Sequence, residues 1–121
     1  MNSHENLVPA EWYRHVKMHP EARAALNATV IGDVELARDA TVLPEAAIRA
    51  DYGERIVIGE GSDVQEGCSL HVDAGFPLTV GRNVIIGHNA TVHGCTVEDG
   101  VLIGMGAIVM NGVHVGKEAL I

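Results

Sequence analysis

Aliphatic residues recur every six positions through most of the chain. A second series of small or aliphatic residues stands two positions earlier, and glycine often follows the main position, as in Ile58-Gly59 and Ile86-Gly87. Neither the 3.6-residue period of a helix nor simple strand alternation produces this pattern. The main series runs in four blocks: Val30, Leu36, Val42 and Ile48; Ile58, Val64 and Leu70; Val80, Ile86 and Val92; and Val97, Ile103, Val109, Val115 and Ile121.

A six-residue period with small residues and glycine predicts short strands joined at sharp corners, three to each triangular coil. The pattern therefore predicts an all-β fold, a left-handed parallel β-helix of about five coils over residues 28–121. Inward side chains would stack into aliphatic columns, with neighbouring coils separated by the normal strand spacing of about 4.8 Å.

Three places break the period. Ile48 to Ile58 and Leu70 to Val80 each span one hexad plus four extra residues, so we expect a small loop to project from a corner at each. The step from Val92 to Val97 is one residue short at Gly94, where glycine can take a tighter backbone.

Residues 1–27 do not follow the repeat. Pro9 to His19 are expected to form a short helix, which Pro20 interrupts, and Glu21 to Leu26 to form another helical turn. This helical segment is expected to cap the open end of the first coil, because solenoids generally need terminal caps.

Composition and charge narrow the function. The formal net charge is -8 and the eight basic residues are scattered, which argues against nucleic acid and membrane surfaces as partners. No apolar run approaches the ~20 residues that span a bilayer, and residues 1–9 lack the features of a signal peptide, so a cytoplasmic location is expected. Cys68 and Cys95 fall at inward positions on different faces and should be buried thiols.

Two histidines are expected to stack on one face. His71 and His93 each follow a main position, three hexads apart, as do Arg49 and Met110. Two imidazoles one coil apart can share one Zn²⁺ at ~2.0–2.1 Å per bond. Two stacked histidines can also be a hydrogen-bonded pair, or ordinary surface residues that stack by coincidence.

His88 is expected on a different face, because it stands two positions after Ile86. It can join the other two histidines only from a neighbouring subunit in a threefold assembly. Gln65 follows Val64 on the same face as His88, one coil earlier, and should also approach the site.

These residues resemble the gamma-class carbonic anhydrases and their close relatives. The segments that carry the resemblance are Ile48-Arg49-Ala50-Asp51, Asp63 to Gly67, Leu70-His71-Val72, Gly87 to Cys95 and Ile103 to Gly106. The resemblance implies a homotrimer with interfacial Zn²⁺ sites, in which Fe²⁺ or Co²⁺ can substitute, and reversible hydration of CO₂ to bicarbonate.

By position, the resemblance assigns His71, His88 and His93 as metal ligands and Gln65 as the residue that orients the metal-bound water or hydroxide. Arg49 and Asp51 would form an intersubunit ion pair near the site, either for the chemistry or as a plain trimer contact.

The sequence also departs from the family. The loop after the first ligand, Val72 to Thr79, contains only one acid, Asp73, for proton export. Tyr52 and Glu54, in the other insertion, are the substitutes that the chain offers for this catalytic step. Family members usually continue into a C-terminal helix that packs along the solenoid, and the sequence to Ile121 is expected to lack it, either as a fragment of a longer chain or as a minimal form.

Three functions are therefore compatible with the sequence. The first is metal-dependent CO₂ hydration. The second is a non-catalytic, metal-stabilised trimeric assembly protein, and the third is a hexapeptide acyltransferase, which typically needs one catalytic histidine where this chain offers three that converge. The three-histidine set favours the first.

Overall fold

The computed structural model describes residues 15–51 and 53–121, which form sixteen short strands in three parallel sheets. Sheet A consists of β1 (Lys17–Met18), β4 (Val34–Leu36), β7 (Ile56–Ile58), β10 (Leu78–Val80), β13 (Thr96–Val97) and β16 (His114–Val115). Sheet B consists of β2 (Arg23–Ala24), β5 (Thr41–Val42), β8 (Asp63–Val64), β11 (Ile85–Ile86) and β14 (Leu102–Ile103). Sheet C consists of β3 (Thr29–Gly32), β6 (Ala47–Ala50), β9 (Ser69–His71), β12 (Thr91–His93) and β15 (Ile108–Val109).

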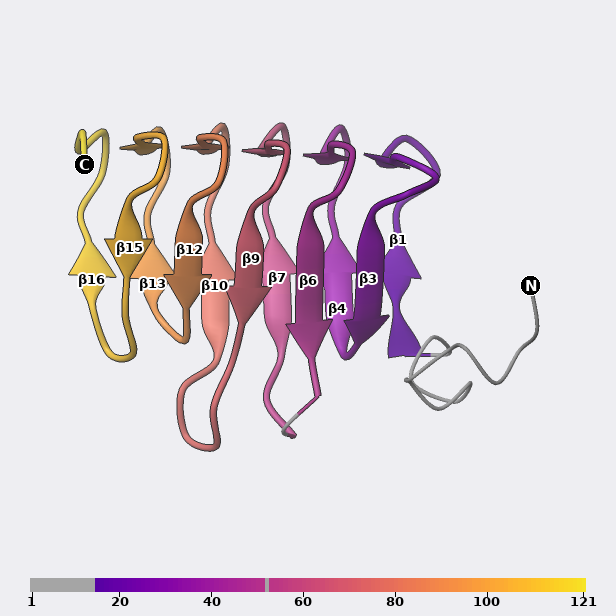
Figure 1. Cartoon of the computed structure of the whole chain (residues 1–121), viewed down its shortest axis with the longest axis horizontal. Coiled ribbons are helices and arrows are strands. Elements are labelled where there is room, and N and C mark those ends of the chain that lie inside the picture. The colour runs from indigo at the N-terminus through magenta and orange to yellow at the C-terminus, as the bar shows by residue number, and fades with distance from the viewer. Residues whose placement is uncertain (1–14, 52) are drawn as a thin grey trace.

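Each strand pairs in register with the strand three places later in the chain, so the chain winds through the three sheets in turn. The strands lie side by side along the long axis of the molecule, with β1 near one end and β16 at the other (Figure 1). The predicted left-handed parallel β-helix of about five coils is confirmed.

The repeat positions stack as the six-residue period predicts. In sheet C, Ile48 pairs with Leu70, Leu70 with Val92 and Val92 with Val109. All four side chains are buried. The columns of the other two sheets are built in the same way, so the core is a stack of aliphatic side chains that leaves little room for rings.

The two insertions and the short step lie where the sequence predicts them. The β6–β7 and β9–β10 loops project from the same edge of the solenoid (Figure 1), and the amide of Gly75 donates a hydrogen bond of 2.8 Å to the Glu54 carboxylate, joining the loops. Gly94 has a φ of 47°, a left-handed conformation that glycine adopts without strain. The register of sheet A is kept across this step, since Val80 still pairs with Val97.

The N-terminal segment differs from the expected helical cap. The helical turn predicted at Glu21–Leu26 is wrong, because Arg23–Ala24 form β2 and pair with β5. Lys17–Met18 form β1 and pair with β4, at the described end of the helix predicted over residues 9–19. Met18 and Ala24 continue the six-residue spacing to Val30, a weak signal because neither is a β-branched residue. The rest of the predicted helix lies outside the described residues.

None of the residues that the structure describes form a helix long and apolar enough to cross a membrane.

Glycines after the inward positions are explained by the close approach of neighbouring coils. A Cβ atom on Gly59 would lie 2.2 Å from the carbonyl oxygen of Gly81, and one on Gly104 would lie 2.7 Å from that of Ile121. Such contacts are far inside van der Waals distance. Gly116 is a counterexample at the same repeat position, since nothing lies within 4 Å of the place its Cβ would take.

The two cysteines are free and buried, as predicted. The Cys68 thiol donates a hydrogen bond to the carbonyl oxygen of Gly87 at 3.0 Å. Burial raises the pKa of the Cys68 thiol, and it raises the pKa of Cys95 to about 11. Both groups therefore stay protonated near neutral pH.

The glycine contacts make a stability prediction. Gly59→Ala should lower the free energy of unfolding by about 1–3 kcal/mol, because the new methyl group must push the next coil away. Gly116→Ala is the matched control and should change it by less than about 1 kcal/mol, in either direction. Urea denaturation measures both, and equal midpoints for the two variants would contradict the close-approach explanation.

The buried thiols make a second prediction. In the native protein at pH 8, Cys68 and Cys95 should react with a thiol reagent much more slowly than in the protein unfolded by guanidinium chloride, because only the exposed thiolate is nucleophilic. The unfolded chain should release both thiols without a reductant. Rapid modification of both thiols in the native protein would show that the inner columns are open to solvent.

Candidate metal centre

The imidazoles of His71 and His93 meet at the end of neighbouring strands of sheet C. His71 is the last residue of β9 and His93 the last of β12, and the two pair in register. His71 Nδ1 lies 3.0 Å from His93 Nε2, and the rings meet edge to face with centroids 4.9 Å apart. The predicted side-by-side placement of these two histidines is therefore observed.

A buried carboxylate holds the outer nitrogen of His71. Asp51, just past the end of β6, accepts a hydrogen bond from His71 Nε2 at 2.6 Å, and its side chain is only 5% exposed. Its other oxygen lies 3.0 Å from Arg49 Nη1. A carboxylate that accepts a hydrogen bond from a histidine fixes the tautomer and the ring orientation, so Asp51 favours a proton on His71 Nε2.

An amide holds the outer nitrogen of His93. Asn111 Oδ1 lies 2.6 Å from His93 Nδ1, and Asn111 Nδ2 donates to Asp73 Oδ2 at 2.9 Å. An ionised carboxylate only accepts hydrogen bonds, so the contact with Asp73 sets which way the amide faces. Asn111 therefore presents its oxygen to His93, and His93 must donate from Nδ1.

The two outer hydrogen bonds decide what the inner nitrogens can do. With protons on His71 Nε2 and His93 Nδ1, the lone pairs of His71 Nδ1 and His93 Nε2 point at each other across 3.0 Å. Two acceptors at this distance repel unless a proton or a metal cation lies between them. Two ligands of a tetrahedral ion with bonds of ~2.0–2.1 Å lie about 3.3 Å apart, so a small opening of the pair accommodates Zn²⁺.

A carboxylate completes the group of potential ligands. One oxygen of Asp73 and one nitrogen each of His71 and His93 all lie within 4.8 Å of one another. Asp73 is exposed, whereas both histidines are half-buried. Among the described residues, this group of three has the donor chemistry and the spacing of a divalent metal site.

His88 and Gln65 follow strands of sheet B, whereas His71 and His93 end strands of sheet C. His88 follows β11, and its Nδ1 lies 3.0 Å from the Glu66 carboxylate, so both side chains occupy the corner that follows sheet B. Gln65 follows β8 one coil earlier and is half-buried. Within one chain, His88 does not belong to the converging group, which agrees with the predicted separation of the faces.

The remaining predicted site residues are Arg49, Asp51 and Tyr52. Arg49 and Asp51 pair within the chain, and their role between subunits stays a prediction. Tyr52 lies outside the described residues. Sequence reasoning assigned no role to Asn111, although it follows Met110, which the repeat places on the same face as His93. Its position in the repeat could therefore have indicated that Asn111 lies near His93.

The β9–β10 loop also packs against the short step at Gly94. A Cβ on Gly94 would lie 2.6 Å from Asn111 Oδ1 and 2.7 Å from the Cβ of Phe76. A larger residue at position 94 would therefore displace the amide that holds His93. The absence of a side chain at Gly94 therefore leaves the space that the Asn111 amide occupies beside His93.

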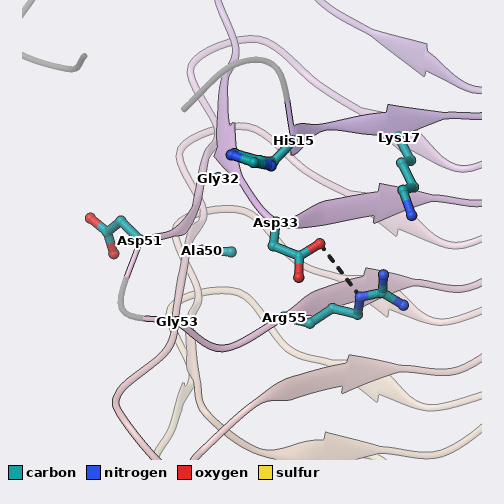
Figure 2. Close-up of a pocket in the computed structure, with 8 residues that line it drawn as sticks. All are labelled: His15, Lys17, Gly32, Asp33, Ala50, Asp51, Gly53 and Arg55. Carbon is teal, nitrogen blue, oxygen red and sulfur yellow. Dashed lines mark ion pairs between the residues drawn. The ribbon is translucent and has the colours of Figure 1, made fainter. Parts of the chain in front are cut away.

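A cavity of about 540 Å³ lies beside the β6–β7 loop, with Asp51 and Gly53 of that loop in its lining (Figure 2). His15, Lys17, Asp33 and Arg55 line it, and Arg55 forms an ion pair with Asp33 at 3.5 Å. In Figure 2 the Asp51 carboxylate points away from Asp33 and Arg55. The cavity shares Asp51 with the histidine pair, but His71 and His93 do not line it, so it is separate from the candidate metal centre.

Comparisons with known proteins agree with this fold and with parts of the site. A family model described as the hexapeptide repeat of succinyl-transferase matches residues 77–111 and 95–121. The carnitine operon protein CaiE of Escherichia coli K12 is 34% identical over 117 residues, which cover 97% of this chain and 56% of CaiE. A probable carbonic anhydrase of Methanocaldococcus jannaschii is 41% identical over 87 residues, which cover 72% of this chain and 54% of that protein.

A solved structure of similar shape comes from Bacillus cereus, a protein provisionally named an acetyltransferase. It superposes with a TM-score of 0.76 at 28% identity, over 88% of this chain and 68% of that one. The chain thus spans little more than half the length of CaiE and of the methanogen protein, and about two thirds of the Bacillus chain.

The hydrogen-bond pattern predicts where the imidazole protons lie. In ¹⁵N-resolved NMR spectra, His71 should carry a proton on Nε2 and His93 on Nδ1, with or without a divalent metal, because Asp51 and Asn111 accept from those atoms. Asn111→Ala should release the His93 Nδ1 proton to fast exchange with water and leave the His71 signal in place. A wild-type His93 with its only proton on Nε2 would rule out the lone-pair arrangement.

Proposed function

Because the chain is similar to hexapeptide-repeat proteins and to the gamma carbonic anhydrases, we propose that it catalyses the reversible hydration of CO₂ to bicarbonate at a divalent metal. The single observation that carries the proposal is the 3.0 Å approach of His71 Nδ1 to His93 Nε2, in two rings whose outer nitrogens are held by Asp51 and Asn111. With protons on the outer nitrogens, the two inner nitrogens repel each other unless a proton or a cation lies between them.

The residues fit the metal that the family implies. His71 Nδ1 and His93 Nε2 would hold it, and His88 of the partner subunit would supply the third imidazole. When bound, a divalent metal acts as a Lewis acid and makes hydroxide available at neutral pH. Zn²⁺ suits a set of three neutral imidazoles, and Fe²⁺ or Co²⁺ suits the same donors.

The outer hydrogen bonds would tune this site. A ligand histidine that donates to a carboxylate is a stronger base and keeps its ring orientation, which is the role of Asp51 toward His71. Arg49 contacts the second oxygen of Asp51 and balances the charge of the carboxylate. Gln65 would orient the water or hydroxide by its side-chain amide, and CO₂ would be attacked at its carbon, with the proton released to the solvent.

The proposal requires a homotrimer, because His88 lies on a different face from the His71–His93 pair. Exposed apolar side chains support an association of these faces. Ile85 and Leu102 stand outward on sheet B, and Ile108 stands outward on sheet C with Met110 just beyond its last strand. Burying them between subunits would remove apolar surface from water.

A second candidate is a metal-stabilised trimer that does not hydrate CO₂. The observation that favours this candidate is that the two acids near the site, Glu54 and Asp73, already accept hydrogen bonds within the fold. Glu54 accepts from the backbone of Gly75, and Asp73 accepts from Asn111. Acids engaged in this way are less suited to passing protons to solvent, which CO₂ hydration requires.

CO₂ hydration by the metal-replete protein tests the proposal. Stopped-flow measurements should show turnover above buffer, and His93→Ala should lower kcat/KM by more than about 100-fold, since loss of a direct ligand exceeds the usual effect of outer-shell changes. His114→Ala is the matched control, because His114 is an exposed imidazole on sheet A that pairs with Glu98, and it should leave turnover unchanged.

Metal analysis separates the two candidates. The proposal expects about one metal per chain, because each trimer has three shared sites. A full complement of metal without hydration above buffer would favour the structural trimer. Protein grown with zinc that holds less than about one third of a metal per chain would contradict both.

A further inference from the structure

We propose that Asp73 is a metal ligand of the single chain: together with His71 and His93 it takes up a divalent cation before the subunits assemble, and His88 of the partner subunit later replaces it. This inference rests on the proposed function, because it concerns the same cation. It adds a fourth donor that the family resemblance does not assign, and an order of events in which metal binding precedes trimer formation.

The placement of Asp73 is the first argument. Its carboxylate belongs to the one group of donors that converges within 4.8 Å among the described residues, and all three members come from one chain. Asp73 stands two residues after His71, at the start of the β9–β10 loop. His88 is not a member of this group, so among the described residues of a single chain Asp73 is the third donor available to the cation.

The backbone around Asp73 is held in place, which is the second argument. Asp73 and Phe76 form a bridge, and the amide of Phe76 donates to the carbonyl oxygen of Asp73 at 2.8 Å. In the same loop, the amide of Gly75 donates a hydrogen bond to the Glu54 carboxylate on the neighbouring loop. Asn111 Nδ2 holds one carboxylate oxygen of Asp73 at 2.9 Å, so a side chain at the surface is kept beside the two imidazoles.

Charge gives the third argument. Two neutral imidazoles leave the full double charge of the cation uncompensated, and they form a weak site. A carboxylate cancels one of these charges and completes a two-histidine, one-carboxylate set, which binds Fe²⁺, Co²⁺ and similar ions and leaves open positions. Such a site captures the metal firmly enough to present it to a second subunit.

Exposure makes the carboxylate the replaceable member of the set. The Asp73 carboxylate is held by Asn111 at the surface, whereas the imidazoles are half-buried and held on their outer nitrogens, so Asp73 is the donor that can move at the lowest cost. Replacing it by a neutral imidazole restores one unit of positive charge to the cation. That stronger charge favours the Lewis-acid chemistry of the assembled enzyme.

Cobalt titration of four chains tests this inference: the wild type, Asp73→Asn, His88→Ala and the double variant. Asparagine keeps an oxygen to accept the hydrogen bond from Asn111, so the loop contacts should survive. Circular dichroism checks that each chain folds. Asp33→Asn in the His88→Ala background is the matched control, because Asp33 is an exposed acid that lies by the separate cavity.

The expected result has two parts. His88→Ala should still bind about one Co²⁺ per chain, with the weak visible absorption of a five- or six-coordinate ion, and adding Asp73→Asn should weaken binding by about 10-fold or more. In contrast, Asp73→Asn alone should keep the intense tetrahedral spectrum expected of three imidazoles. The Asp33→Asn control should bind as His88→Ala does.

Other results would overturn the inference. If His88→Ala binds no cobalt, or binds it equally well with and without Asp73, the single chain has no carboxylate ligand. In both cases a wild type that binds cobalt would leave the proposed function standing. A wild type that binds no cobalt would overturn the proposed function and this inference together.

Discussion

The in-register pairing of each strand with the strand one coil away is the constraint on which the rest of the structure depends. Because each inward aliphatic residue pairs with another, the residues that follow them stack as well, and this places Arg49, His71 and His93 in one row. A slip of one residue would turn the whole row to the other side of the sheet. The core and the candidate metal centre are therefore specified by the same register.

The irregular places in the repeat supply what the regular coils cannot. A perfect solenoid would present two stacked imidazoles with nothing to choose their protonated nitrogens. The β6–β7 insertion begins with Asp51, which holds His71, and the β9–β10 insertion begins just before Asp73, which orients Asn111. At the shortened step, Gly94 has no side chain, and this leaves the space that the Asn111 amide occupies beside His93. Each departure from the period thus contributes one partner of the histidine pair.

Two carboxylates near the histidine pair, Asp51 and Asp73, have different roles. The buried Asp51 is balanced by Arg49 and by the His71 ring, and it polarises that ring without contacting the space between the imidazoles. Asp73 is exposed and lies directly beside that space. One carboxylate is thus a buried support for a ligand, and the other, held by Asn111 at the surface, can change its partner. This difference links metal uptake by one chain to completion of the site by another.

The six-residue period alone determined the fold, the inward columns, the two loops and the common face of His71 and His93, because in a solenoid neighbours in space are separated by a constant number of residues. It missed β1 and β2, since Met18 and Ala24 are weak markers of the repeat. The partners of the histidines were decided only by the tertiary structure. Asp51, Asn111 and Asp73 reach the pair through loops and a shortened turn, where the constant spacing no longer tells which side chains meet.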